Sequence, residues 1–133
     1  MTNYAFKNTV SVPMDEVEDL VRTALASEGF GVITEIDFKK TLKAKLDVDF
    51  RPYKVLGACN PPLAYQALGA DVDIGLLLPC NVLIYEGDAP GTTVVAAIDP
   101  VRQLGVAGRD DLGDLAEEVA ARLRRVVDGL PTG

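Results

Sequence analysis

Histidine is absent from this 133-residue sequence, and serine is scarce. The absence of histidine excludes Ser/His and Cys/His nucleophile pairs, imidazole general bases and the commonest metal ligand in proteins. Ser11 and Ser27 are the only serines, and neither lies in a Gly-x-Ser-x-Gly elbow. The sequence also has no Gly-x-x-x-x-Gly-Lys phosphate loop and no Gly-x-Gly-x-x-Gly fingerprint, so nothing in it supports nucleotide binding.

Positive charge and long apolar runs are also limited. With 20 acidic and 13 basic residues the net charge is −7, which repels phosphate backbones, so we expect no nucleic-acid partner. The longest apolar run near the middle, residues 74–85, contains a proline and is well short of the roughly 20 residues that span a membrane. We therefore expect no membrane association. The first ten residues lack the basic and apolar segments of a secretion signal, which predicts a cytoplasmic protein.

The residues that are present suffice for a packed core. Hydrophobic residues make up 48% of the chain and charged residues 25%, which is typical of a globular protein. A chain of this length is close to the usual size of one domain, so we predict a single domain over residues 1–133.

Hydrophobic periodicity predicts an α+β fold. Two long helices are expected, one between Pro13 and Gly29 and one through residues 112–127, because each has a continuous apolar stripe and acidic residues at its start. Short helices are expected after Asp37 and after Asn60, both of which are good N-cap residues. Extended segments are expected at residues 3–12, 30–38, 53–59, 76–86 and 92–98.

Two of these segments carry more specific predictions. Residues 30–38 alternate so that Phe30, Val32 and Ile36 would share one face, packed against the first helix. Pro79 lies within the run 76–86, and because proline cannot donate a ladder hydrogen bond it predicts a bulge or a sheet edge there. Residues 99–108 are expected to form a loop before the last helix.

The order of these elements predicts a mainly antiparallel sheet with the two long helices on one face and the short helices around it. The opposite face would also carry apolar residues in several strands. We therefore expect a homodimer that buries this face.

The candidate site comes from the two cysteines, each followed directly by an asparagine. Cys59 precedes Asn60, a favoured N-cap residue, and therefore lies at a switch from strand to helix. A thiol at a helix N-terminus has a lowered pKa. Cys80 follows Pro79. If Pro79 kinks the chain so that Cys80 approaches Cys59, the two thiols could bind a soft metal, exchange disulfides or hold a cofactor.

Other interpretations of the same residues remain open. Two thiols are too few for a closed tetrahedral metal site, so a metal at Cys59 and Cys80 would need carboxylates, a second subunit or an exogenous ligand. Alternatively, both cysteines are small buried hydrophobic residues. Asn81 is unusual in a strand and would hold an irregular backbone or face a cavity. Tyr53 could donate a hydrogen bond at the same place.

The segments YKVLGACNPPLAYQAL (53–68) and IGLLLPCNVLIYE (74–86) resemble the signature of the bacterial and archaeal domain-of-unknown-function 302 family. The resemblance extends to EGFGVITEID (28–37) and VDFRPYKVLG (48–57). It implies a small α+β domain with a TATA-binding-protein-like arrangement of an antiparallel sheet and two main helices, often as a homodimer. It implies no catalytic residues. The positions that match the signature are Cys59, Asn60, Pro61, Pro79, Cys80 and Asn81.

Three functional hypotheses follow. The first is a cytoplasmic homodimeric protein that binds a small ligand, metal or cofactor in a pocket formed by the two Cys-Asn segments. The second is a thiol-based redox or sulfur-transfer enzyme that uses Cys59 and Cys80 and therefore requires a reactive thiol of low pKa. The third is a structural or assembly module without a ligand. The residues proposed to contact a ligand are Cys59, Asn60, Cys80, Asn81, Tyr53 and Pro79.

Overall fold

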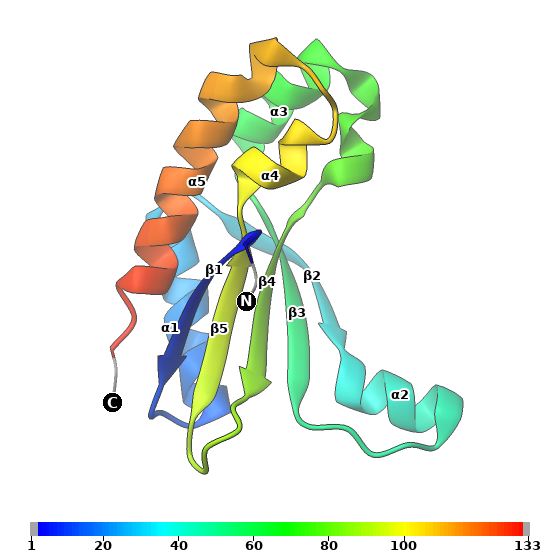
Figure 1. Ribbon diagram of the computed structural model, residues 1–133, viewed down its shortest axis with the longest axis vertical. Coiled ribbons are helices and arrows are strands. Elements are labelled where there is room, and N and C mark those ends of the chain that lie inside the picture. Colours follow the sequence, from blue (N-terminus) through cyan, green and yellow to red (C-terminus); the bar gives the residue numbers. More distant parts are fainter. Residues whose placement is uncertain (1–2, 132–133) are drawn as a thin grey trace.

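The computed structural model describes residues 3–131 as a five-stranded antiparallel sheet with helices packed on one face and at one end (Figure 1). The strand order is β1-β5-β4-β3-β2. The strands are β1 (Ala5–Val10), β2 (Gly31–Asp37), β3 (Tyr53–Cys59), β4 (Cys80–Glu86) and β5 (Thr93–Ile98). The helices are α1 (Met14–Ser27), α2 (Phe38–Leu46), α3 (Pro61–Ala70), α4 (Pro100–Gly105) and α5 (Gly113–Asp128), with 3-10 turns η1 (Val72–Leu77) and η2 (Asp110–Leu112).

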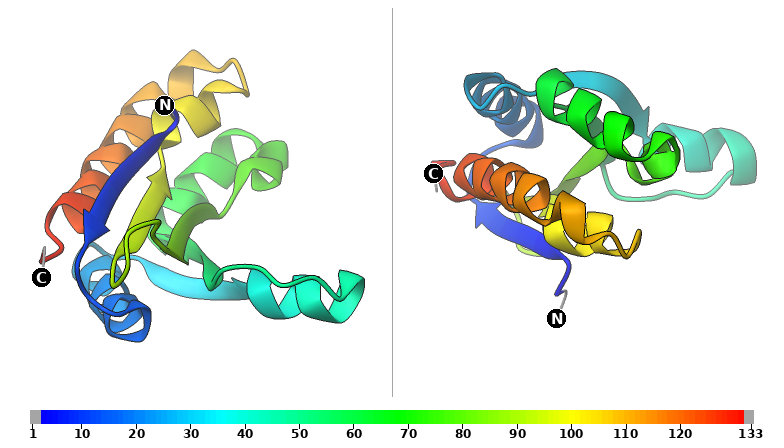
Figure 2. Two further views of the ribbon diagram at one scale, coloured as in Figure 1. Left: turned by 60° about the horizontal axis from the view of Figure 1, so that its bottom comes forward. Right: turned by 90° about the horizontal axis from the view of Figure 1, so that it is seen from above.

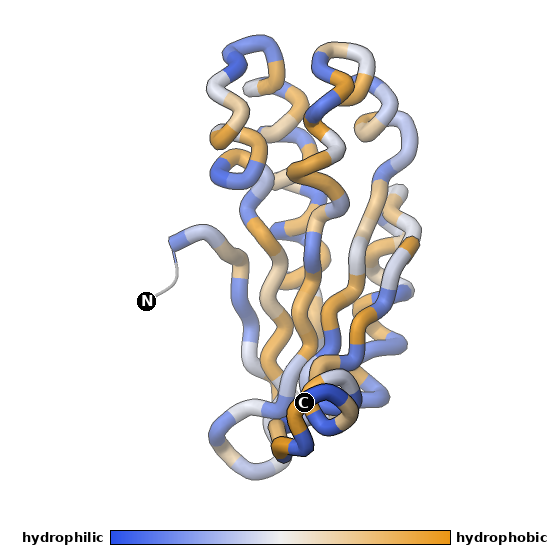
Figure 3. The backbone as a smooth tube through the Cα atoms, turned by 90° about the vertical axis from the view of Figure 1, so that its right-hand side faces the viewer, coloured by the Kyte–Doolittle hydropathy of each residue, from blue (hydrophilic) through white to orange (hydrophobic). Residues whose placement is uncertain are grey.

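The predicted α+β class is confirmed, and the two long helices, α1 and α5, cover the same face of the sheet (Figure 2). Apolar residues at helical spacing line the buried side of each helix, and the central strands β3, β4 and β5 are mostly hydrophobic along their length (Figure 3). The main core formed in this way includes Val21, Leu25, Leu56, Val82, Val95 and Leu123. Within residues 3–131 no helix has both the length and the apolar composition needed to cross a bilayer.

Local signals explain where these elements begin and end. Asp37 caps α2 by accepting a hydrogen bond from the backbone N–H of Lys40. Gly29 follows α1 with a φ of +84°, a backbone conformation that glycine adopts without steric cost. The side chains of β3 alternate between the two faces of the sheet, because Leu56 pairs with Val82 on the helix side while Val55 pairs with Leu83 on the opposite side.

The expectation that β2 would present one continuous face to α1 is wrong. Its register with β3 shifts between Val32 and Thr34, where a bulge inserts an extra residue. Val32 therefore packs against the main core, whereas Ile36 is on the opposite face and exposed. A one-residue shift reverses every later side chain, because strand side chains alternate with a period of two.

The expected strand through residues 76–86 and the expected loop at 99–108 both need correction. Residues up to Leu77 belong to η1, and β4 begins only at Cys80, between β3 and β5 in the sheet. Pro79, joined to Leu78 by a cis peptide bond, thus precedes a central strand instead of lying in a bulge or at an edge. Residues 100–105 form the short helix α4, capped by the side chain of Asp99 with proline at its first position.

A second, smaller core lies at the end of the sheet, beneath α3, η1, α4 and the start of α5. Its buried members are Ala67, Ile74, Leu104, Leu112 and Ala116. Helix α5 contributes side chains to both cores, so it connects them mechanically.

Helix α2 projects away from the body of the protein (Figures 1 and 2) and has no buried residue. In Figure 1 strands β3, β4 and β5 lie in front of α1 with no helix before them, which leaves that face of the sheet open. This face carries Val55, Leu83 and Ala96, although Val55 and Ala96 are themselves only 7% and 3% exposed. An aromatic cluster that includes Tyr53 and Tyr85 lies at its α2 end.

Candidate functional site

The two Cys-Asn segments meet around one cavity at the end of the sheet, where β3 leads into α3 and η1 leads into β4. The cavity has a volume of about 260 Å³. Cys59, Asn60, Pro79 and Cys80 all contribute to its lining, together with apolar side chains from α3, α4 and α5. Four of the six residues proposed from the sequence are therefore brought together.

Asn60 is the predicted cap of α3 and also ties that helix to α1. Its side-chain oxygen accepts a hydrogen bond from the N–H of Leu63 at 3.4 Å, as an N-cap residue does. Its amide nitrogen donates to the carbonyl oxygen of Glu28, also at 3.4 Å. The side chain is 7% exposed and both ends of its amide are occupied. The role of Asn60 in positioning the cavity wall is thus structural.

Cys80 is a buried, hydrogen-bonded thiol. Its S–H donates to Gln103 Oε1 at 3.5 Å. Burial, with a smaller contribution from the nearby Cys59, raises the pKa of the Cys80 thiol to about 12. At neutral pH Cys80 is therefore a neutral hydrogen-bond donor.

Gln103, from α4, is a site residue that the sequence reasoning missed. Its amide nitrogen donates to the carbonyl oxygens of Leu77 and Pro79, the latter at 3.3 Å, while its amide oxygen accepts from Cys80. One side chain thus holds the turn that carries Pro79 and Cys80. The Asp99-Pro100 pair could have indicated the helix, but no local pattern indicates what Gln103 contacts.

Cys59 and Cys80 occupy offset positions on neighbouring strands. Ala58 pairs with Cys80, so alternation directs the side chains of Cys59 and Cys80 to opposite faces of the sheet. Both are free thiols, with Cys80 buried and Cys59 half-buried. The cavity reaches both because it lies at the end of the strands, where α3 and η1 replace the sheet.

Gly57 allows the segment before β4, residues 78–79 and here called the Pro79 corner, to pack against β3. A Cβ added to Gly57 would overlap the Thr34 hydroxyl and lie 2.8 Å from Pro79 Cγ. Any larger residue would push the Pro79 ring away from the sheet. The close approach of this corner, and with it the position of Cys80, therefore depends on a glycine.

Asn81 and Tyr53 do not line this cavity. Asn81 pairs with Gly57 and borders a different hollow of about 300 Å³, with Ile98 among its neighbours. Tyr53 lies at the other end of β3, where its ring stacks on Tyr85 with centroids 5.3 Å apart. Burial raises the pKa of Tyr53, and Tyr85 adds to this effect. The ligand contacts proposed for these two residues stay predictions.

A metal held by Cys59 and Cys80 would need ligands from elsewhere. Among residues 3–131, no three or more His, Cys, Asp or Glu side chains gather closely enough to hold a metal ion. The two thiols fit a soft ion by their chemistry, but they supply only part of a coordination shell.

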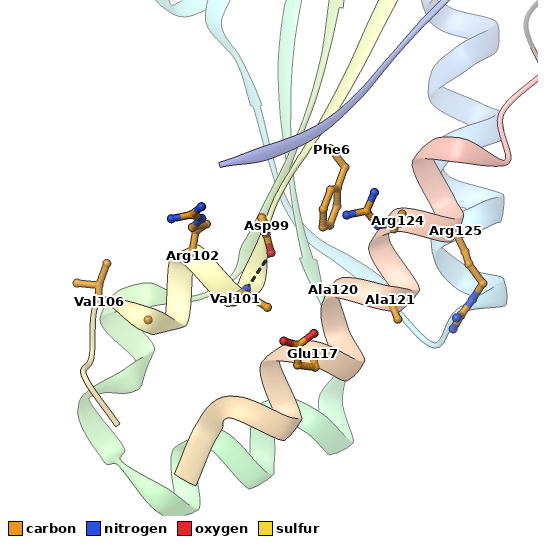
Figure 4. Close-up of a pocket in the computed structure, with 11 residues that line it drawn as sticks. Phe6, Asp99, Val101, Arg102, Val106, Glu117, Ala120, Ala121, Arg124 and Arg125 are labelled. Carbon is orange, nitrogen blue, oxygen red and sulfur yellow. Dashed lines mark hydrogen bonds between the residues drawn. The ribbon is translucent and has the colours of Figure 1, made fainter. Parts of the chain in front are cut away.

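A larger groove, of about 990 Å³, lies between α4 and α5 (Figure 4). There the Arg124 guanidinium lies over the Phe6 ring, 4.4 Å from its centroid, and Asp99 caps α4 through the N–H of Val101. Acidic and basic side chains both border this groove, including Glu117. The sequence-predicted site residues lie elsewhere.

Comparison with known proteins gives a family and a fold. A family model described as "Domain of unknown function DUF302" matches residues 6–130. The crystal structure of an uncharacterized conserved protein DUF302 from Bacillus stearothermophilus is similar, with a TM-score of 0.87 and 28% sequence identity. The similarity covers 96% of this chain and 98% of that one. Among curated proteins there is no match.

Proposed function

The chain belongs to the DUF302 family, and we propose that it is a binding protein. Its site is the cavity between the two Cys-Asn segments. One observation carries this proposal. Cys59 and Asn60 from one segment and Pro79 and Cys80 from the other line the same cavity of about 260 Å³. Small-molecule sites are typically concave, mostly apolar and formed by residues distant in sequence.

The state of Cys80 favours binding over thiol catalysis. A thiol nucleophile must ionise near neutral pH, whereas burial raises the pKa of Cys80 to about 12. Its proton is also engaged with Gln103. Cys80 therefore contributes a neutral wall to the cavity, and a redox or sulfur-transfer mechanism that needs two activated thiols has less support.

The binding proposal is tested by NMR. Amide spectra of the protein would be recorded with a panel of neutral, anionic and cationic fragments and with Cu⁺ and Zn²⁺. We expect at least one member to shift the resonances of Leu63, Ala67 and Cys80, which surround the cavity.

Two variants of α3 provide the matched comparison. Ala64→Leu fills the cavity, whereas Ala70→Leu adds the same group on an exposed position outside it. Binding should be lost in the first and kept in the second. A double Cys59→Ser, Cys80→Ser variant distinguishes metal binding, which it would abolish, from ligand binding, which it would weaken only modestly. If no member of the panel shifts the resonances of the cavity residues, the hypothesis that remains is a structural module without a ligand.

We also propose that the protein is a homodimer, through the open sheet face and the segment 38–52, here called the α2 arm. The arm exposes Leu46 (66%), Val48 and Phe50, although such apolar groups are normally covered. It carries five basic and two acidic residues, a net charge of +3, which leaves −10 for the rest of the chain out of the total of −7. A second copy therefore offers the arm a surface of opposite charge.

Sedimentation velocity tests the dimer. Phe50→Asp places a charge on the arm, and Val72→Asp places the same charge on another exposed apolar residue, in η1. We expect the first variant to be monomeric and the second to remain dimeric. A wild-type protein that sediments as a monomer at every concentration tested would end this proposal.

A cytoplasmic location is part of the same proposal. Both cysteines are free thiols, which suits a reducing compartment. Cell fractionation with an antibody against the protein would test it, and recovery outside the cytoplasmic fraction would contradict it.

A further inference from the structure

The cavity between the two Cys-Asn segments lies where the two hydrophobic cores meet. Phe30, Cys80 and Val119 in its wall belong to the main core, and Ala67 and Leu104 belong to the smaller one. A molecule in the cavity would therefore contact both cores at once. Burial of apolar surface would be its main source of affinity.

The wall carries no charge. The side chains that line the cavity include no Asp, Glu, Lys or Arg. An ionised ligand would leave water without an opposite charge to compensate it, which is strongly unfavourable. The electrostatics of the site thus favour a neutral ligand.

The polar groups in the wall are already paired within the protein. The Asn60 amide bonds to Leu63 and Glu28, and the Cys80 thiol donates to Gln103. A ligand that competes for them would break these bonds, which hold α3 and the Pro79 corner in place. Among the described residues, Cys59, which is half-buried, is the one polar side chain of this wall that makes no side-chain hydrogen bond.

The cavity has an apolar mouth. Ile33 in the bulge of β2 is 61% exposed, and Leu68 of α3 is also exposed, and both border the cavity. The cavity is therefore open to solvent on this side, and its exposed apolar rim forms a path that a hydrophobic molecule can follow from solvent.

The volume sets the size of the ligand. An apolar cavity of about 150 Å³ accommodates benzene. By proportion, the 260 Å³ of this cavity accommodates about ten non-hydrogen atoms, the size of a bicyclic aromatic ring.

We propose that the cavity binds a neutral hydrophobic molecule of about the size of a bicyclic ring and discriminates against ionised analogues of that molecule. This inference rests on the proposed binding function and adds the chemical class of the ligand.

Indole, indole-3-carboxylate and tryptamine test it, since they share a ring system and differ in charge. We expect indole to shift the amide resonances of Leu63, Ala67 and Val119 in a saturable titration. The carboxylate and the amine should bind at least about tenfold more weakly. Ala64→Leu should weaken indole binding by at least about tenfold, whereas Ala70→Leu should leave it unchanged, with circular dichroism confirming that both variants are folded.

Each other outcome overturns the inference in a recognisable way. Ionised analogues that bind the cavity as tightly as indole would refute the ligand class and leave the binding function intact. Indole binding that Ala64→Leu does not weaken would refute the site. If the amide resonances of the cavity residues shift when the protein is diluted but not when indole is added, a side chain of a second copy of the protein occupies the cavity. If neither indole nor any fragment or metal in the panel perturbs the cavity, the binding function fails as well.

Discussion

At the scale of single residues, Gly57 and Cys80 have properties that their neighbours in the sequence do not reveal. Both depend on the Pro79 corner. Gly57 lies beneath the Pro79 ring, and Cys80 begins the strand that follows it. Substituting Gly57 or Cys80 should therefore change the stability of the protein differently from the same substitution at a nearby glycine or cysteine.

Gly57→Ala should destabilise the protein by about 1–3 kcal/mol, because the new methyl group overlaps Thr34 and Pro79. Thr34 can rotate its hydroxyl, but the proline ring must move. Gly31→Ala on the adjacent strand is the control, since nothing lies within 4 Å of its added Cβ. Urea denaturation would measure both, and equal stability of the two variants would contradict the packing described for Gly57.

Stability should fall at alkaline pH because of Cys80. The thiol ionises near pH 8.5 in the unfolded chain but only near 12 in the fold. Above pH 8.5 the unfolded state loses its proton while the folded state retains it. The contribution of Cys80 to the free energy of unfolding is therefore complete below pH 8.5 and declines above it. By pH 10 this loss amounts to about 2 kcal/mol.

Urea unfolding at pH 7 and pH 10, under reducing conditions, measures the effect. Tyrosine and lysine titrations affect all variants alike, so the comparison is between variants. Cys80→Ala should lose less stability than the wild type between the two pH values. The same pH dependence in Cys80→Ala and wild type would show that Cys80 is not buried as described.

At the scale of elements, a charged cluster joins α1 to β2 and β3. Lys54 donates to Glu18 at 2.8 Å, Arg22 donates to Glu18 at 3.0 Å, and Glu35 pairs with both basic residues. Burial alone would raise the pKa of Glu18, but the hydrogen bonds from Lys54 and Arg22 outweigh it and hold the pKa below its ordinary value. The hydrogen bond to Glu18 raises the pKa of Lys54.

Lys54→Met should therefore destabilise the protein by about 1–2 kcal/mol at pH 7, because it leaves Glu18 largely buried with one cation fewer. The Glu18 contribution is present above its unfolded pKa near 4.3 and is lost as the pH falls through its lower folded pKa. The difference between variant and wild type should thus shrink below pH 4.

Lys43→Met provides the control. It removes a lysine from an ion pair with Asp47, in which both side chains are mostly exposed. Its effect should stay below about 0.5 kcal/mol. Urea midpoints for the two variants at pH 7 and pH 3.5 decide the matter, and equal effects would mean that the Glu18 cluster contributes no more than a surface pair.

At the scale of the whole molecule, α5 makes the two cores mechanically dependent. Ala116, at its start, belongs to the smaller core, while Leu123 and Val126 belong to the main one. Loss of either core would remove the support of this helix from the other. The chain is therefore expected to unfold as a unit.

We predict a single thermal transition for the wild type. Far-ultraviolet circular dichroism, which follows the helices, and near-ultraviolet tyrosine signals, which follow the Tyr53 and Tyr85 end of the sheet, should give the same midpoint. If the protein is a dimer, that midpoint should rise with protein concentration. Two separated transitions would show that the smaller core folds independently.

The sequence was sufficient to predict the class of the fold and most of its elements. Helices α1 and α5 and the cap residues Asp37 and Asn60 follow from periodicity and capping, which act between residues a few positions apart. The family resemblance followed from the two Cys-Asn segments and is confirmed.

Only the tertiary structure decided the rest, because those features depend on contacts between distant segments. The bulge in β2 is defined by its register with β3, and the role of Gln103 depends on a turn 24 to 26 residues earlier in the chain. The two Cys-Asn pairs are visible in the sequence, but the burial that makes Cys80 neutral arises only when α3, α4 and α5 close over the end of the sheet. Local pattern thus determined which elements form, and packing determined which of their residues share a cavity.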